Sequence, residues 1–146
     1  MSDGVFNISK GAFAEKIRDA ATNVLIFLLK ANEAESTLVD RTDIADLLAE
    51  AGNTEADFTN YARKTGLTGT VTVDNTNDRV DVDVPDPTWT SAGGATNNTL
   101  TKLVTAYEES AADSGRVPLT HHDFGATTDG SDLTAQVNAA GFARAA

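Results

Sequence analysis

Residues 70–89, TVTVDNTNDRVDVDVPDPTW, carry the clearest structural pattern of this chain. Val71 and Val73 alternate with threonines, and valines at positions 80, 82 and 84 alternate with charged residues. This period of two is typical of a β-strand with one buried face, and residues 75–78, NTND, have the composition of a turn. The stretch therefore predicts a β-hairpin.

The hairpin is expected to end at Pro85 and Pro87, because proline cannot donate a hydrogen bond to a neighbouring strand. The only tryptophan, Trp89, follows at once. We expect Trp89 to be a core anchor that fills the space between the valine face of the hairpin and the helices.

Two helices are predicted in the N-terminal third. Apolar residues recur at helical spacing in 9–21, and again in 42–51, where Ile44, Leu47 and Leu48 lie on one face. Thr42 is the expected cap of the second helix, which Gly52 ends.

The run 24–29, VLIFLL, lies between these helices and is too short for a helix of its own. A continuous apolar run of this length predicts a strand that is buried on both faces, in the middle of the sheet. Residues 31–41 are mostly polar and are expected to be a connection.

The later part of the chain is richer in strand signals. Residues 60–65 and 99–107 each fit a helical face or a strand, and both are interpreted as strands. Residues 117–124 predict an edge strand interrupted by proline, and Asp129-Gly130 predicts a hairpin turn into 133–137. The tail, 139–146, is expected to be disordered or docked on a neighbour.

Together these segments predict an α+β fold, mainly an antiparallel β sheet or sandwich, with two short helices in the N-terminal third. The length of 146 residues suits a single domain, 1–146. Its ends, at about 1–8 and 139–146, are candidates for flexible segments.

Composition excludes several classes of function. The chain has no cysteine, which excludes disulfides, thiolate metal sites and a cysteine nucleophile. Its net charge is −11 and the acidity is spread along the chain, so nucleic acid is a poor partner. No apolar run is long enough for a membrane span and the start lacks a signal peptide, so we expect synthesis in the cytoplasm.

Two clusters are candidates for functional sites. His121, His122 and Asp123 could bind zinc or assist proton transfer, but neighbouring residues on a strand point to opposite faces, so a surface or interface pair is favoured. The aspartates of 74–86 do not follow the calcium-loop pattern, so a solvated strand face is favoured. Nucleophile and phosphate motifs are absent from the sequence. We therefore predict no enzymatic activity, no catalytic residue, no metal and no cofactor.

Five segments carry a family resemblance. They are SDGVFNISKG (2–11), TNYARKT (59–65), DNTNDRVDVDVPDPTWTSAGG (74–94), VPLTHHDF (117–124) and TTDGSDLTAQVNAAGFARAA (127–146). They resemble a family of small virion structural proteins of tailed bacteriophages, especially those that infect actinobacteria. The resemblance is missing mainly from residues 31–57.

The resemblance implies a non-enzymatic part of the virion, foremost a minor capsid or decoration protein on the capsid surface. The alternatives are a head-to-tail connector (neck) or tail component and, more remotely, a calcium- or glycan-binding β-domain. The implied partners are the shell of major capsid protein and further copies of the chain, with a homotrimer favoured.

The candidate interface residues lie at the two ends of the chain. They are apolar or cationic side chains on segments too short to bury them alone: Val5, Phe6, Ile8, Phe142 and Arg144.

Overall fold

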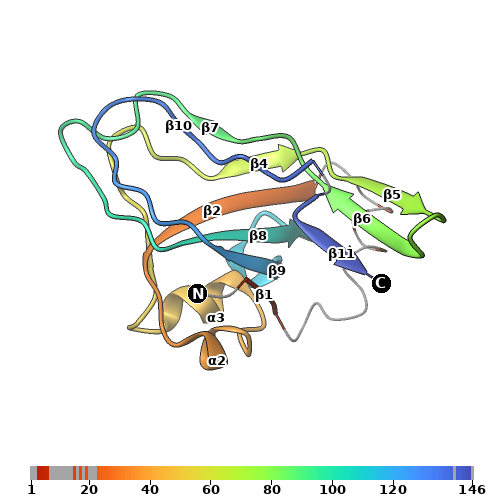
Figure 1. Ribbon diagram of the computed structural model, residues 1–146. Coiled ribbons are helices and arrows are strands. Elements are labelled where there is room, and N and C mark those ends of the chain that lie inside the picture. Colours follow the sequence, from red (N-terminus) through yellow and green to blue (C-terminus); the bar gives the residue numbers. More distant parts are fainter. Residues whose placement is uncertain are drawn as a thin grey trace.

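The computed structural model describes residues 3–6, 15, 17, 19, 23–139 and 141–145. At its centre lies a six-stranded antiparallel sheet (Figure 1). Five strands run in the order β1-β9-β8-β2-β3, and β4 also pairs with β2. Their bounds are β1 (Gly4–Val5), β2 (Val24–Ala31), β3 (Thr54–Glu55), β4 (Lys64–Leu67), β8 (Lys102–Glu108) and β9 (Arg116–Asp123).

Strand β2 is buried on both faces, as the run 24–29 predicted. Its alternate residues Val24, Ile26 and Leu28 belong to one cluster of buried side chains, here called the first core. Leu25, Phe27 and Leu29 belong to a second cluster, the second core. The central sheet therefore separates two cores, and β2 lies between β8 on one side and β3 and β4 on the other.

Two short helices cover the second core, α2 (Glu35–Leu38) and α3 (Ile44–Ala49), through Leu38, Ile44 and Leu47. Helix α3 confirms the helix predicted in 42–51. Its cap is Asp43 rather than Thr42, because the Asp43 carboxylate accepts a hydrogen bond from the Asp46 N–H at 2.8 Å. Helix α2 lies in the segment expected to be a connection.

The helix predicted at 9–21 lies outside the described residues except at positions 15, 17 and 19. Of these, Ile17 is fully buried in the first core.

The predicted hairpin is present, with strands β5 (Thr70–Asp74) and β6 (Arg79–Asp83). Val71 lies opposite Val82, and Val73 opposite Val80. The C-terminal strand β11 (Ala143–Ala145) pairs antiparallel with the other edge of β6. Figure 1 shows this three-stranded sheet extending away from the central sheet. The tail expected to be disordered or docked on a neighbour thus includes a strand of the chain's own sheet.

Other strand predictions had mixed outcomes. The strand predicted in 99–107 is confirmed as β8, whereas in 60–65 the strand begins only at Lys64. The segment after Asp129-Gly130 does not return as a hairpin: β10 (Leu133–Thr134) pairs with β7 (Thr88–Trp89). The strand predicted at an edge, β9, has part of that edge covered by β1. A short 3-10 helix, η3 (Asp113–Gly115), precedes β9.

Trp89 lies in the first core and is only 1% exposed. The expected surroundings are present in part: Ile17, from the first predicted helix, lies in the same core, whereas α3 packs on the opposite face of the central sheet. Val82 and Val84 of the hairpin segment share the first core with Trp89, together with residues of β2 and β8.

Candidate functional site

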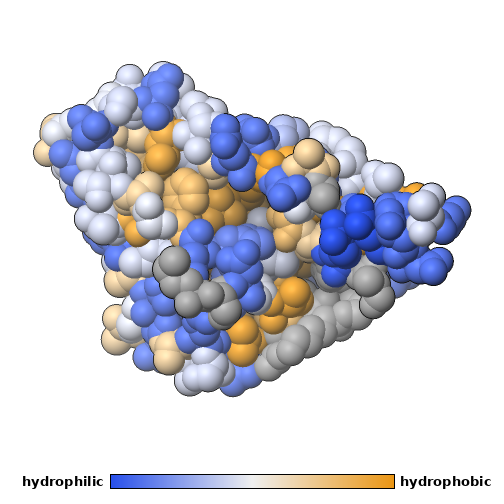
Figure 2. Space-filling model, viewed as in Figure 1, coloured by the Kyte–Doolittle hydropathy of each residue, from blue (hydrophilic) through white to orange (hydrophobic). Residues whose placement is uncertain are grey.

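A cleft of about 490 Å³ lies between the C-terminal segment and the strands β8 and β9. Ligand sites commonly have volumes in this range. The face of the molecule drawn in Figure 2 is hollowed near its centre, where hydrophobic and hydrophilic residues lie side by side. The lining residues are Asp3, Ile26, Leu103, Thr105, His122, Asp123, Phe124, Ala135, Gln136, Val137, Asn138, Gly141, Phe142, Ala143 and Arg144.

Three of the lining residues, Asp3, Thr105 and His122, belong to a chain of four polar side chains that Thr120 completes beneath the surface of the cleft. Asp3 Oδ2 lies 3.3 Å from His122 Nδ1, and His122 Nε2 lies 2.9 Å from Thr120 Oγ1. Thr120 Oγ1 lies in turn 2.5 Å from Thr105 Oγ1. A neutral His122 that donates from Nδ1 to Asp3 accepts at Nε2 from the Thr120 hydroxyl, so every member of this chain has a partner.

This order of carboxylate, imidazole and hydroxyl is also the order of a nucleophilic triad. The burial of Thr120 argues against that chemistry here. Thr120 is 2% exposed and does not line the cleft, so its hydroxyl is not presented to a substrate. The chain instead joins β8, β9 and the N-terminal segment.

The two histidines point to opposite faces of β9, as their adjacent positions predicted. The favoured surface or interface pair is nevertheless wrong for His121, which is 1% exposed and lies against Phe6 of the second core. His122 faces the cleft. The polar chain has no signal in the sequence, because its members come from three separate segments.

A buried ion-pair cluster lies around Lys102 of β8. Lys102 is 3% exposed and its ammonium group binds the carboxylates of Glu35 and Asp123. Burial alone would lower the pKa of Lys102, but the two carboxylates raise it above its ordinary value. The cluster thus fastens α2 to the sheet with a charged lysine.

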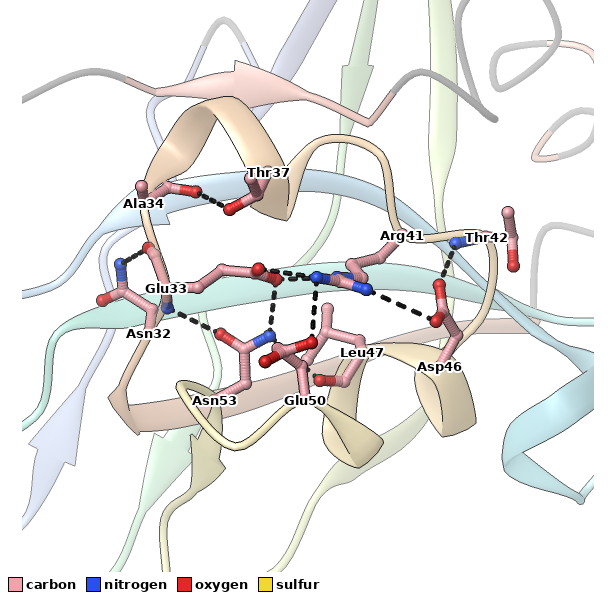
Figure 3. Close-up of polar contacts among 10 residues, drawn as sticks. All are labelled: Asn32, Glu33, Ala34, Thr37, Arg41, Thr42, Asp46, Leu47, Glu50 and Asn53. Atoms are coloured by element: carbon pink, nitrogen blue, oxygen red, sulfur yellow. Dashed lines mark hydrogen bonds and ion pairs between the residues drawn. The ribbon is translucent and has the colours of Figure 1, made fainter.

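A second polar cluster closes the loop that carries α2 and α3 (Figure 3). Arg41 donates to both carboxylate oxygens of Glu33, at 2.7 and 2.6 Å, and Asn53 Nδ2 donates to the same carboxylate at 2.8 Å. The Arg41 guanidinium holds the pKa of Glu33 at about 2. The polar groups of these side chains bind one another, so the cluster has a structural role: it holds the loop closed.

The aspartates of the hairpin also make local contacts. Asp74 accepts hydrogen bonds from the Thr76 and Asn77 backbone N–H groups, at 3.1 and 3.2 Å, and lies 3.2 Å from Arg79. Within the described part of the chain, no three His, Asp or Glu residues are grouped so that they could hold a metal ion.

The candidate interface residues have different environments. Phe6 is fully buried in the second core, so the expectation that it contacts another copy is corrected: β1 brings its ring inside the chain's own fold. Val5 is partly exposed and pairs with Thr120, while Ile8 lies outside the described residues.

The two C-terminal candidates line the cleft. Phe142 packs against the first core, and Arg144 Nε donates to Asp81 at 2.8 Å. The Arg144 side chain remains 45% exposed. Contacts of these residues with a partner stay a prediction.

Comparisons with protein-family models, with curated proteins and with solved structures found no match. In the described ranges, no helix is long and apolar enough to cross a membrane.

Proposed function

We propose that this protein is a non-enzymatic structural protein of a tailed-phage virion that decorates and stabilises the outside of the capsid. The five segments that resemble such virion proteins support this role. They include most of the projecting sheet: residues 74–94 contain β6, and residues 127–146 contain β11. The proposed partners are the shell of major capsid protein and further copies of this chain.

The observation that carries the proposal is the edge of this projecting sheet. Strand β5 pairs with β6 on one side, and no strand among the described residues pairs with its other side. An unpaired strand edge offers backbone N–H and C=O groups to a neighbouring subunit. Val73 on β5 is 58% exposed and is the single large hydrophobic side chain of the described residues that is exposed.

A contact at β5 would combine backbone hydrogen bonds with burial of Val73. On the face drawn in Figure 2, the right-hand side of the molecule, where the hairpin projects, is mostly hydrophilic. Such an edge suits a contact between preformed subunits, because the isolated protein remains covered by polar groups while the contact itself has an apolar centre.

The test is co-sedimentation of the labelled protein with shells of its own phage that lack it. We expect saturable binding at many sites over the whole shell, and bound shells should break at a higher temperature. If the shell exterior is also acidic, repulsion by the net charge of −11 should weaken binding at ~10 mM salt relative to ~150 mM, because the screening length falls from ~30 Å to ~8 Å.

Two variants of β5 locate the contact. Val73→Lys places a charge at the apolar centre and should reduce shell binding at least tenfold, about 1.4 kcal/mol. Thr72→Lys adds the same charge to the opposite face of the same strand, where Thr72 is already exposed, and should bind more strongly than Val73→Lys. Equal binding by both variants would exclude Val73 from the contact.

The distribution of bound copies separates the proposed role from its alternatives. A few copies confined to one vertex, or binding to tails and not to shells, would replace decoration by a neck or tail role. Sedimentation of the free protein tests self-association, for which a homotrimer is expected. A protein that stays monomeric at high concentration would exclude a preformed trimer. The trimer would then have to assemble on the shell.

A further inference from the structure

The N-terminal segment, residues 3–6, lies along β9. Gly4 is opposite His121, and Val5 is opposite Thr120. Two further hydrogen bonds hold the segment: the Phe6 N–H donates to the Leu119 carbonyl at 3.1 Å, and the Asp123 N–H donates to Asp3 at 3.2 Å. We call this contact the N-terminal latch.

A buried histidine lies directly under the latch. His121 is 1% exposed, and the Phe6 ring meets its ring edge-to-face with centroids 5.5 Å apart. Gly4 covers the same ring so closely that a Cβ at position 4 would lie 2.5 Å from His121 Nε2. Neither ring nitrogen of His121 has a hydrogen-bond partner among the described residues.

This environment accepts a neutral imidazole far better than a charged one. An imidazolium needs a partner or water at both N–H groups, and burial removes the water. The charged groups around His121 do not compensate: Lys102 of β8 and His122 of β9 oppose a positive charge, whereas Glu35 of α2 and Asp3 of the latch favour it. The pKa of His121 is accordingly lowered, first by burial and then by Lys102.

We propose that the N-terminal latch is a pH-sensitive device that opens when His121 takes up a proton. Opening removes Phe6 and Gly4 from the ring and gives both N–H groups access to water. In the open state the imidazole has an ordinary pKa of about 6.5. Because the closed state has the lower pKa, latch stability is fully present above pH ~6.5 and is lost as the pH falls below it.

The second histidine, His122, also contacts the latch, through Asp3. The Asp3 carboxyl keeps a lowered pKa: its partial burial acts to raise it, but hydrogen bonds from Asp123 and His122 outweigh that effect. The two neighbouring histidines therefore contact different residues of the latch, Phe6 and Asp3, and variants of each can separate their effects.

The size of the effect has an upper limit. In this limit His121 binds no proton in the closed state. The equilibrium constant for opening is then proportional to the total population of the open state, which is the sum of its neutral and protonated forms. Between pH 8 and pH 5 that sum grows at most about 30-fold for an open-state pKa of about 6.5.

The measurement is hydrogen exchange of the Phe6 amide in the full chain, expressed as a protection factor so that the intrinsic pH dependence of exchange is removed. We expect protection of Phe6 to fall between pH 8 and pH 5, by up to about 30-fold. Amides of β2 and β8 should keep their protection, which separates latch opening from global unfolding.

Two matched variants assign the effect. His121→Leu places an apolar side chain under the latch and should abolish the fall in Phe6 protection. His122→Gln removes the other histidine, and this variant should still show the fall in Phe6 protection. Protection of Phe6 that is independent of pH in the unchanged protein, or a pH dependence that survives in His121→Leu, would overturn the proposal.

A third variant tests the contact without relying on the stability of His121→Leu. Gly4→Ala would place a methyl group against the His121 ring and should lower Phe6 protection already at pH 8. Unchanged protection in Gly4→Ala would contradict the close approach on which the proposal rests.

Discussion

Trp89 connects segments that are distant in the sequence. Its ring is buried in the first core, its Nε1–H donates to the Ala62 carbonyl at 2.8 Å, and Lys64 Nζ lies 5.4 Å from its ring centroid. The residue thus ties β7 to the segment that leads into β4.

Replacing Trp89 by alanine should lower the free energy of unfolding by about 3–5 kcal/mol, because it leaves a large cavity in the first core. Trp89→Phe keeps most of the apolar contact but leaves the Ala62 carbonyl without its donor, so a smaller loss of about 1–3 kcal/mol is expected. Urea unfolding of both variants measures the difference. A Trp89→Ala protein as stable as the unchanged one would contradict the role of Trp89 in the core.

Glu33 should make the stability depend on pH in acid. Its pKa is about 2 in the folded chain against an ordinary 4.5, and its side chain is 11% exposed. Its contribution is therefore present above pH 4.5 and is lost as the pH falls towards 2. Allowing for residual solvent screening, we expect a loss of about 2 kcal/mol.

The measurement compares urea unfolding at several pH values in that window. Glu33→Gln should show a shallower decline than the unchanged protein. Glu50→Gln is the matched control, because Glu50 contacts the same Arg41 only at 3.4 Å and is 44% exposed. A decline of the same steepness in Glu33→Gln and the unchanged protein would exclude Glu33 as its source.

Among the elements, β11 depends on one backbone conformation before it. Gly141 has a φ of 90°, which favours glycine, and a Cβ at this position would collide with the Val82 carbonyl. The next residue, Phe142, donates its N–H to that same carbonyl at 2.9 Å. The turn at Gly141 therefore brings the tail onto β6.

Gly141→Ala should detach β11 from β6 and increase hydrogen exchange at the Phe142 amide. Gly125→Ala is the control, since a Cβ there would have no atom within 4 Å of it. Equal Phe142 protection in the two variants would show that β11 does not depend on Gly141.

At the scale of the whole molecule, the net charge of −11 should prevent binding to duplex DNA. A mobility-shift assay at ~50 mM salt is the severe test, because phosphate contacts are still strong there. Clear retention of the duplex would contradict the expectation and would also count against a place on the outside of the shell.

Several elements were predictable because their signals are local. The hairpin follows from the alternation of valines, β2 from a continuous apolar run, and α3 from apolar residues at helical spacing. Residues 99–107 were ambiguous, because Leu100, Leu103 and Val104 have helical spacing while the composition favours a strand. Pairing of β8 with both β2 and β9 resolved that ambiguity, and such pairing depends on distant residues.

The sequence by itself determined the fold class, the hairpin and the burial of Trp89, because alternation and apolar runs act over a few neighbouring residues. Only the tertiary structure decided that β10 pairs with β7, that β11 closes onto β6, and that Asp3 meets His122. These contacts join segments separated by tens of residues or more. Their partners are selected by shape and polarity across the assembled fold, which no local pattern records.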